Sequence, residues 1–340
     1  MHEIIIKMQN LQKLKVGVVG NGSWATAIVK MLCENSEKVN WWVRDEYTKG
    51  FIENQKHNPK YLTGVEFHPE KICLTTDINK LVKNSDYLIL AVPSIYLQNA
   101  LSGLKENLSD KVIFSAIKGI IPEIKDVVGV FLQREMKVPK ENIGIITGPS
   151  HAEEVAMERL SYLTVAALNE KTAANMASCI ESRYIKTTLS DDIFGTEYAS
   201  VLKNIFAIAS GIARGLGYGD NFQAVLISNS IREMKRFLDV VFPINRDINN
   251  SAYLGDLLVT GYSSFSRNRL LGNMIGKGYT VRSAILEMNM VAEGYYAAQS
   301  IYEKAKSENI NMPITQTVYQ ILYEGKNPDK EIKNLCDVLN

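Results

Sequence analysis

Several features that would point to whole classes of function are scarce or absent in this sequence of 340 residues. The four cysteines, Cys33, Cys73, Cys179 and Cys336, lie far apart and form no Cys-x-x-Cys pair. The four histidines form no cluster with metal-ligand spacing either. These spacings argue against a structural zinc site and predict that no metal is bound. Scattered, reduced thiols are typical of a cytosolic protein.

The sequence also lacks long apolar runs and an excess of charge of one sign. Its 38 Lys and Arg residues against 37 Asp and Glu residues give a net charge of +1, so no overall field attracts nucleic acid or a membrane surface. No run reaches the roughly 18 apolar residues of a membrane span, and residues 1–13 contain only a short isoleucine run. We therefore expect a cytoplasmic protein without membrane insertion, with residues 1–13 as an N-terminal arm.

What the sequence does contain is a glycine-rich turn near its beginning. Residues 14–19 are an apolar run that suits a buried parallel strand, and helix-forming sequence begins near Ser23. Between them, Gly20 permits a tight turn, Gly22 lets a pyrophosphate approach the backbone, and Ala25 lets the helix lie close to its strand. The helix N-terminus attracts phosphate. The pattern predicts a dinucleotide site; the alternative is an ordinary glycine-rich turn.

Strands and helices alternate along the first half of the chain. Further strands are predicted at 38–43, 72–76, 87–92, 112–117, 142–147, 162–168 and 184–189. This alternation predicts an α/β fold with a doubly wound, Rossmann-type parallel sheet over residues 14–190. Beyond Asp191 the periodicity is helical, with glycine-rich breaks at 215–219, 255–261 and 276–278. We expect an all-helical substrate and catalytic domain over 191–340, with a cleft between the two domains.

The end of the second strand bears on the choice of cofactor. In NAD-binding folds an acidic residue there holds the ribose 2′-hydroxyl, but this strand ends in Arg44 followed by Asp45. An arginine can bind the 2′-phosphate of NADP by charge-assisted hydrogen bonds. We therefore expect NADP as the preferred cofactor, with NAD possible because of Asp45. The alternative is that Arg44 is a solvated loop cation.

One helix after residue 195 carries an unusual lysine. An apolar face over 198–212 predicts a core stripe, while Lys203 lies on a face of small and polar residues that includes Ser200, Ala207 and Ser210. One interpretation is close helix packing with a lysine whose ammonium reaches solvent. The other is a cleft wall with a partly desolvated amine, whose pKa burial lowers to about 7–8 for acid–base work.

Polar residues at the ends of predicted elements form further candidates. Ser150 and Glu153 match a capping box, but Gly148 before them and Lys118 both lie at the carboxyl edge of the sheet, where ligands of such folds bind. Asp256 precedes an apolar run and is expected to anchor a partner at a helix end.

Residues 266–269 form a further candidate. Ser266 is expected to cap a helix whose first turn holds Arg267 and Asn268, which suits an anion site. A solvated basic helix start is the alternative.

Together these segments resemble the NAD(P)-dependent glycerol-3-phosphate dehydrogenases of the bacterial biosynthetic type. The resemblance covers nearly all of residues 14–325. It is carried by Gly20-Asn-Gly-Ser-Trp-Ala, Asn58-Pro-Lys-Tyr-Leu, Lys118-Gly-Ile, Gly148-Pro-Ser-His-Ala-Glu, Leu202-Lys-Asn-Ile-Phe-Ala, Gly255-Asp-Leu, Ser266-Arg-Asn-Arg and Val291-Ala-Glu-Gly-Tyr. It implies reduction of dihydroxyacetone phosphate to sn-glycerol 3-phosphate, a precursor of phospholipids. We also expect a homodimer.

The resemblance also implies a role for each matching residue. Lys203 would be the general acid and base, and Asp256 would keep it in place by our own inference. The cofactor would be bound by Gly20, Gly22, Ser23, Trp24, Arg44, Tyr61, Lys118, Ala152, Arg267, Val291 and Glu293. The substrate would be bound by Lys118, Gly148, Ser150, Lys203, Asn204, Asp256, Ser266, Arg267 and Asn268.

Three departures from the family pattern stand out: Ala25 replaces a usual glycine, His151 a usual phenylalanine, and Ala252-Tyr253 a usual Ala-Gly pair. None falls on a residue implied to be catalytic. Two alternatives stay open. A β-hydroxyacid dehydrogenase would share the layout but bind a carboxylate, and a sensor would bind NADPH without catalysis. Lys118 and Lys203 argue against the sensor.

Overall fold

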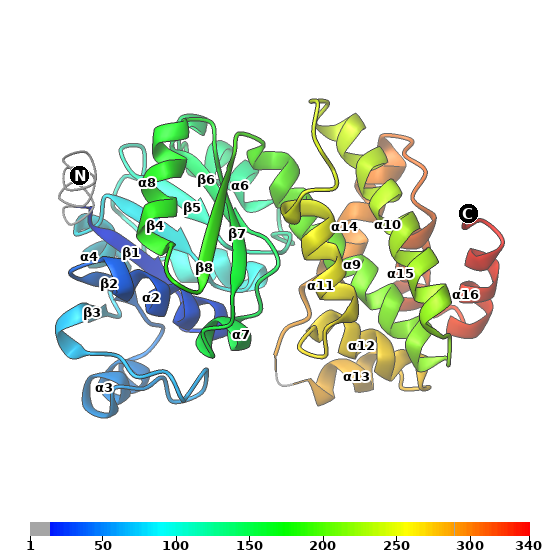
Figure 1. Cartoon of the computed structure of the whole chain (residues 1–340), viewed down its shortest axis with the longest axis horizontal. Helices are drawn as coiled ribbons and strands as arrows, with labels where there is room; N and C mark the ends of the chain where they lie inside the picture. The colour runs from blue at the N-terminus through cyan, green and yellow to red at the C-terminus, as the bar shows by residue number, and fades with distance from the viewer. Residues whose placement is uncertain (1–13, 289) are drawn as a thin grey trace. The chain divides into compact units, whose positions relative to one another are not determined.

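A computed structural model of the protein describes residues 14–288 and 290–340, which form two compact units (Figure 1). We call residues 14–117 with Val128–Ile193 the sheet unit, and Lys118–Val127 with Phe194–Asn340 the helical unit. The arm predicted for residues 1–13 lies outside the described residues. The chain therefore enters the helical unit twice, first with a ten-residue segment that begins at Lys118.

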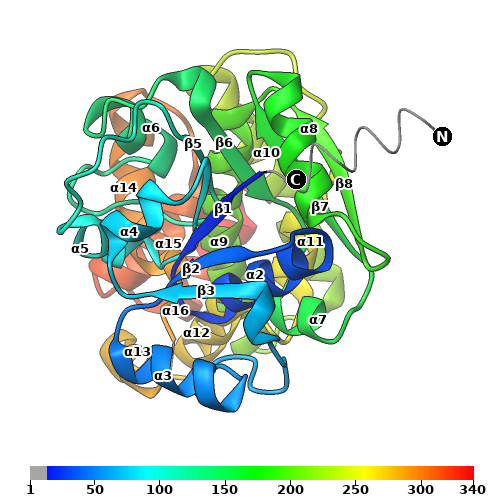
Figure 2. The ribbon, with the colours of Figure 1, turned by 90° about the vertical axis from the view of Figure 1, so that its left-hand side faces the viewer.

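Eight strands make one sheet in the sheet unit. They are β1 (Val16–Val19), β2 (Val39–Trp42), β3 (Ile72–Thr75), β4 (Tyr87–Leu90), β5 (Val112–Ser115), β6 (Ile143–Thr147), β7 (Ser161–Ala167) and β8 (Ile185–Ser190). Their order is β3-β2-β1-β4-β5-β6-β7-β8, and the first three can be followed in Figure 2. The chain order reverses between β1 and β4, so the doubly wound sheet is confirmed.

Strand β7 departs from the predicted parallel arrangement, since it runs antiparallel to β6. The reason is the short connection between them, whose helix α7 (Ala152–Ala156) has five residues. Such a helix spans only about 7 Å, too little to carry the chain back along β6. Strand β7 therefore begins near the edge where β6 ends, and β8 then pairs parallel to β7.

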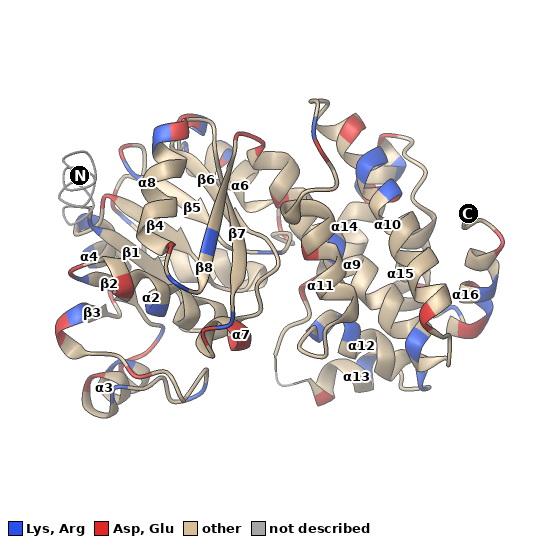
Figure 3. Ribbon diagram, viewed as in Figure 1, with Lys and Arg blue, Asp and Glu red and all other residues tan. Residues whose placement is uncertain are grey.

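Seven helices surround this sheet in the described residues of the unit. Besides α7 they are α2 (Ser23–Asn35), α3 (Glu46–Gln55), α4 (Ile78–Lys83), α5 (Leu97–Leu101), α6 (Val128–Arg134) and α8 (Glu170–Ile180). Three short 3₁₀ turns, η1 (Pro69–Lys71), η2 (Ser94–Tyr96) and η3 (Lys140–Asn142), lie in the connections. Acidic and basic residues are interspersed over both units, as Figure 3 shows.

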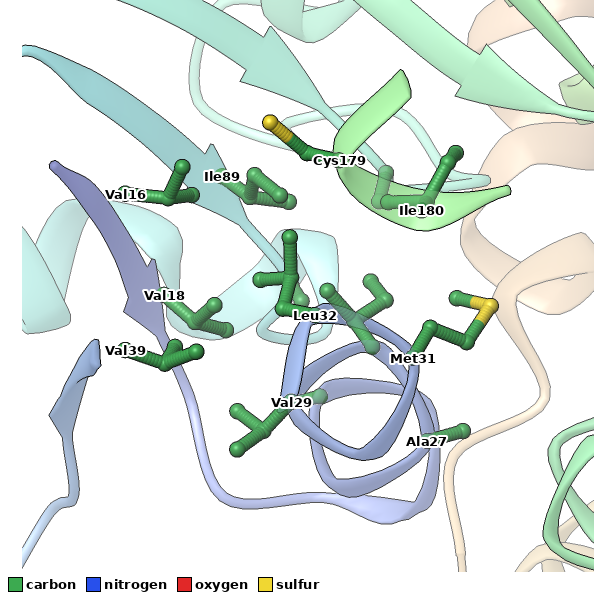
Figure 4. Packing of buried hydrophobic residues seen from close by; sticks show 14 of the residues in the cluster. Val16, Val18, Ala27, Val29, Met31, Leu32, Val39, Ile89, Cys179 and Ile180 are labelled. Carbon is green, nitrogen blue, oxygen red and sulfur yellow. The ribbon is translucent and has the colours of Figure 1, made fainter. Parts of the chain in front are cut away.

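Helix α2 packs its apolar face on the sheet beside the glycine turn. Leu32 lies among Val18 of β1, Ile89 of β4 and Ile180 of α8 (Figure 4), and all four are buried. Full burial of one such side chain stabilises the fold by about 1.5–3 kcal/mol. This contact fixes where α2 starts relative to β1.

The helical unit contains the helices α9 (Ile193–Gly215), α10 (Asp220–Val241), α11 (Asp256–Tyr262), α12 (Arg267–Gly276), α13 (Val281–Glu287), α14 (Glu293–Ser307), α15 (Pro313–Tyr323) and α16 (Pro328–Cys336). A π-helical turn, η4 (Ser251–Gly255), leads directly into α11. Helix α9 is buried on nearly all sides: its apolar stripe, including Tyr198 and Leu202, is fully buried, and Ser200 and Ala207 on the opposite face are buried too.

The predicted glycine-rich breaks are right at 215–219 and 276–278, where α9 and α12 end. The break predicted at 255–261 is wrong, because these residues belong to η4 and α11. Gly261 lies within α11 and packs against α10 instead of making a turn. A Cβ there would lie 2.8 Å from Ile227 of α10.

Helices α9 and α12 cross with their backbones in contact. A Cβ on Gly211 would overlap the carbonyl oxygen of Arg269, and a Cβ on Gly272 would overlap that of Ile208. Gly215 and Gly276 repeat this contact one turn further along. Two pairs of glycines four residues apart thus let the helix that carries Lys203 touch the helix that begins at Arg267.

No helix among the described residues is long and apolar enough to cross a membrane. In the same part of the chain, no group of three or more His, Cys, Asp or Glu residues is arranged to hold a metal ion. The four cysteines are free thiols.

Candidate active site

The glycine turn has the geometry that a pyrophosphate requires. Gly20 has φ +128°, and a Cβ there would lie 2.7 Å from the carbonyl oxygen of Ala91. Gly22 caps α2 without a side chain, and a Cβ placed on it would meet nothing within 4 Å. No acidic residue lies in the first turn of α2, so its positive N-terminal end is not offset there. The residues present therefore fit a dinucleotide phosphate.

Asn58 holds this turn in place from a distant loop. Its amide nitrogen donates to the carbonyl oxygen of Asn21 and to Thr26 Oγ1, both at 2.9 Å, and Asn58 is buried. Its Oδ1 accepts from the backbone nitrogen of Tyr61 at 3.1 Å. The segment from Asn58 to Tyr61 is thus tied to the glycine turn and to the first turns of α2.

The end of β2 separates the two residues that bear on cofactor choice. Arg44 is exposed, with 73% of its side chain accessible, and its Nε lies 3.5 Å from Asp45 Oδ2. Asp45 caps α3 by accepting from the backbone nitrogen of Thr48 at 2.7 Å. That hydrogen bond is the main cause that lowers the pKa of Asp45.

The turn after β6 differs from the predicted capping box. Helix α7 begins at Ala152 with His151 as its N-cap, so Ser150 lies outside the helix. The Ser150 hydroxyl donates instead to the carbonyl oxygen of Gly148 at 3.0 Å. Gly148 has φ +112°, a conformation in which a side chain would be strained. Because the Ser150 hydroxyl donates within this turn, it does not cap the helix. The capping-box interpretation is therefore wrong, while Gly148 and Ser150 do end the strand at the carboxyl edge.

The helical unit brings two lysines and one aspartate together. Lys203 Nζ donates to Asp256 Oδ1, as expected, and Lys118 Nζ lies 3.6 Å from Asp256 Oδ2. Lys203 and Asp256 are 4% and 1% exposed, so the interpretation of Lys203 as a lysine that reaches solvent is wrong. Two ammonium groups share one carboxylate, which leaves a positive charge beside Lys203 that favours a developing oxyanion.

This burial tunes the acidity of Lys203. Loss of hydration disfavours its charged form and is the main cause that lowers the Lys203 pKa to about 7. Asp256 acts in the opposite direction, and the Lys118 ammonium lowers the pKa further. A pKa near neutrality suits a group that both donates and accepts a proton.

Two asparagines surround this lysine cluster. Asn204 donates to the carbonyl oxygen of Lys118 at 2.7 Å, and Asn268 accepts from the backbone nitrogen of Gly294 at 2.9 Å. A Cβ on Gly294 would lie 2.6 Å from the carbonyl oxygen of Asn204 and 2.9 Å from Asn268 Oδ1. The start of α14 therefore touches both asparagines, which places Asn268 of α12 beside α9.

The start of α12 follows the prediction closely. Ser266 caps the helix by accepting from the backbone nitrogen of Arg269 at 3.3 Å, and its hydroxyl keeps a proton to donate. Arg267, the first residue of the helix, is exposed. A cation beside a helix N-terminus suits a phosphate.

The structure thus groups Lys118, Lys203, Asn204, Asp256 and Asn268 in the helical unit. Ser266 and Arg267 directly precede Asn268 in the chain. Glu293 directly precedes Gly294, whose nitrogen donates to Asn268, and Val291 lies two residues before Glu293. The remaining candidates belong to the sheet unit: Gly20, Gly22, Ser23, Trp24, Arg44, Tyr61, Gly148, Ser150 and Ala152.

Asn58 and Gly294 were not predicted to have a role of their own. Two sequence signals were available for them: Asn58 stands directly before a proline, and Gly294 stands in the first turn of a helix.

Comparison with known proteins decides the family. Residues 15–173 match the N-terminal model of NAD-dependent glycerol-3-phosphate dehydrogenase, and residues 192–333 match its C-terminal model. The chain belongs to this family. It is similar to glycerol-3-phosphate dehydrogenase [NAD(P)+] of Macrococcus caseolyticus, with 34% identity over 95% of this chain and 98% of the relative. The Thermoanaerobacter relative is 35% identical, over 95% of this chain and 96% of its own.

A solved structure agrees with these relatives. The crystal structure of glycerol-3-phosphate dehydrogenase from Coxiella burnetii has a TM-score of 0.87 and 27% identity, and the match covers 95% of this chain and 99% of that one. As a member of the glycerol-3-phosphate dehydrogenase family, the chain is an NAD(P)-dependent oxidoreductase.

Proposed function

We propose that this enzyme reduces dihydroxyacetone phosphate to sn-glycerol 3-phosphate, reversibly, with Lys203 as the proton donor. The observation that carries the proposal is the buried cluster of Lys203, Asp256 and Lys118. Such a cluster offers a proton and a positive charge in one place, which is what a carbonyl oxygen needs as it becomes an alcohol. A sensor that only bound the cofactor would have no use for it.

Each member of the cluster has its own task. When bound, the nicotinamide cofactor would provide the hydride that the carbonyl carbon receives. Lys203, as an ammonium, donates its proton to the carbonyl oxygen, and in the reverse direction its neutral amine takes the proton of the C2 hydroxyl. Asp256 keeps Lys203 oriented, and Lys118 stabilises the negative charge that develops on the oxygen. Asn204 holds the backbone of Lys118 and orients the substrate.

We assign the substrate phosphate to the start of α12. Arg267 provides a cation there, and Ser266 and Asn268 provide polar groups beside a helix N-terminus. Gly148 and Ser150 of the sheet unit complete the proposed substrate contacts. A β-hydroxyacid dehydrogenase would bind a carboxylate instead, so a dependence of turnover on the phosphate distinguishes the two functions.

We propose that NADP is the preferred cofactor, with residues 14–190 as the cofactor domain and 191–340 as the substrate and catalytic domain. Asp45, the residue that would bind a ribose hydroxyl, is engaged in capping α3, while Arg44 extends into solvent. If Arg44 binds the 2′-phosphate, Arg44→Ala should raise the KM for NADPH about ten- to a hundredfold. The KM for NADH should stay unchanged, and equal effects on both would contradict the preference.

The central experiment measures NADPH oxidation by the purified enzyme after addition of dihydroxyacetone phosphate. Turnover with this ketone, and much weaker turnover with unphosphorylated dihydroxyacetone and with β-keto acids, would support the proposal. Faster turnover with a β-keto acid would support the hydroxyacid alternative. Binding of NADPH without any turnover would support the sensor.

The cellular setting follows from the same proposal. The product is a precursor of phospholipids, and we propose that the enzyme makes it in the cytoplasm as a homodimer. Light scattering coupled to size-exclusion chromatography tests the dimer, since a chain of 38.1 kDa should then elute with twice that mass.

A further inference from the structure

The segment Lys118–Val127, which we call the 118–127 loop, leaves the sheet unit after β5 and folds with the helical unit. Its own backbone closes it. The Ile121 nitrogen donates to the carbonyl oxygen of Asp126 at 3.0 Å, and the Lys125 nitrogen donates to that of Ile121 at 2.8 Å. Lys118, at the first end of this loop, thus depends on how the other end is attached.

Asp126 makes that attachment in a buried position. Its Oδ1 accepts from the Tyr198 hydroxyl of α9 and from the Val127 nitrogen, and Lys304 Nζ of α14 lies 3.5 Å from its Oδ2. The Lys304 ammonium also lies over the Tyr198 ring, 5.5 Å from its centre. Asp126 is 6% exposed and Tyr198 is fully buried. We call Asp126, Tyr198 and Lys304 the loop anchor.

The first end of the loop is attached to the same helix. Asn204 of α9 holds the carbonyl oxygen of Lys118, and Tyr198 lies six residues before it, about 9 Å along the helix axis. Helix α9 is therefore hydrogen-bonded to both ends of the loop, and it also carries Lys203. A third link, from Lys125 to Glu303 at 2.7 Å, is largely exposed and adds little.

We infer that Asp126 and Tyr198 are positioning residues that hold the Lys118 ammonium against Asp256, beside Lys203. The inference rests on the proposed function, since it assigns a task to Lys118 in that reaction. The charged groups that act on Lys203 include Asp256 and Lys118, and the titratable groups that contact Asp126 include the Tyr198 hydroxyl and the Lys304 ammonium. We assign Asp126 and Tyr198 an effect on the reaction only through Lys118.

The test removes the Tyr198 hydroxyl and follows both the rate and its pH profile. Because a shift of about 1 Å at a reacting group can cost up to about a hundredfold, Tyr198→Phe should lower kcat for dihydroxyacetone phosphate by ten- to a hundredfold. The KM for NADPH should change much less than kcat, because most of the proposed cofactor contacts do not involve Lys118. Since Lys118 lowers the pKa of Lys203, its displacement should move the alkaline fall of the reduction rate to higher pH. A loss of stability alone would not move that profile.

The chain offers a matched control in Tyr323→Phe. The Tyr323 hydroxyl donates to the carbonyl oxygen of Tyr295 at 2.7 Å, in the same unit and in a half-buried position, and this hydrogen bond includes no residue of the 118–127 loop. This variant should lose comparable stability and keep the wild-type rate and pH profile. Equal rate losses in the two variants would overturn the inference.

A double-mutant cycle asks whether Tyr198 acts through Lys118. In the Lys118→Ala background, Tyr198→Phe should cause almost no further loss of kcat, because the side chain it positions is gone. The same fold-loss in both backgrounds would mean that Tyr198 acts elsewhere and would refute the inference. If Tyr198→Phe does not fold, Lys304→Gln takes its place in the cycle.

A second measurement does not depend on turnover. The rate at which acetic anhydride acetylates Lys118, followed by peptide mass spectrometry, should rise several-fold in Tyr198→Phe and stay at the wild-type value in Tyr323→Phe. An unchanged rate in Tyr198→Phe would overturn the inference even if the enzyme proved to have another substrate. Failure of wild-type enzyme to reduce dihydroxyacetone phosphate would instead overturn the proposed function.

Discussion

The glycine turn of the sheet unit and the lysine cluster of the helical unit are built in opposite ways. The turn is made of neighbours in sequence, and its chemistry is that of the backbone: a positive φ at Gly20 and an uncapped helix end at Gly22. The cluster joins residues 53 positions apart, Lys203 and Asp256, and adds Lys118 from a separate loop. Its chemistry comes from buried charges.

This difference predicts how each region responds to mutation. A backbone site is lost when an atom is added, because the approach of the ligand is blocked. A buried charge site is lost when an atom is removed, because the remaining charges lose their partner and their pKa values move. The four experiments below test this contrast.

The largest effect is expected for Lys203→Met. This change keeps the aliphatic stem and the helix propensity, so the fold should survive. A positioned proton donor contributes about 10²–10⁴-fold, and kcat should fall by that factor while the dissociation constant for NADPH stays the same. Steady-state kinetics and cofactor titration measure both. A folded variant that keeps most of its kcat would remove Lys203 from the mechanism.

Arg267→Ala should have the next largest effect. Loss of a charge-assisted hydrogen bond of about 1.5–3 kcal/mol corresponds to a ten- to hundredfold fall of kcat/KM for dihydroxyacetone phosphate. Unphosphorylated dihydroxyacetone, a poor substrate, should be affected much less. If both ketones lost the same factor, the phosphate would have to be bound elsewhere.

The pH profile should follow the protonation of Lys203. Reduction needs the ammonium, so kcat/KM for dihydroxyacetone phosphate should fall above a pH of about 7, tenfold per unit at the limit, while glycerol 3-phosphate oxidation rises over the same range. Asp256 favours the ammonium, so Asp256→Asn should move the fall to lower pH. Profiles that coincide for the wild type and this variant would show that another group titrates.

The smallest effect is expected for Gly22→Ser. Serine is a good N-cap residue, and a Cβ at this position meets no protein atom within 4 Å, so stability should be unchanged or slightly higher. The added side chain should raise the KM for NADPH about tenfold, or 1.4 kcal/mol. Gly20→Ala is the contrasting variant, since its positive φ predicts a loss of stability in thermal unfolding. A wild-type KM for NADPH in Gly22→Ser would show that the phosphates lie elsewhere.

The same contrast explains what could be predicted from the sequence. The turn, the strands and the cap at Ser266 follow from local spacing and were predicted nearly to the residue. The pairing of Lys203 with Asp256 was inferred only once the family resemblance had suggested that both residues lie in one site. Periodicity along α9 could not show that both faces of the helix are buried.

Other features could not be predicted, because they depend on tertiary contacts. The capping box at Ser150 failed because the backbone turn at Gly148 used the hydroxyl. The antiparallel β7 depends on the length of α7, and Gly261 packs against Ile227 within a helix where a turn was predicted. The return of the 118–127 loop to α9 depends on Asp126 and Tyr198, 72 residues apart.

The crossing of α9 and α12 has a consequence for how this enzyme can change. Overpacking in a protein core is commonly relieved by a second-site suppressor, in which a neighbouring side chain becomes smaller. At Gly211 and Gly272 each helix already presents only backbone to the other, so neither position has a smaller neighbour to offer. A larger residue at either glycine can therefore be relieved by reversion to glycine, but not by a smaller side chain on the facing helix. Lys203 and Arg267, to which we assign the two ends of the substrate, thereby lie on two helices whose contact sequence drift cannot easily readjust.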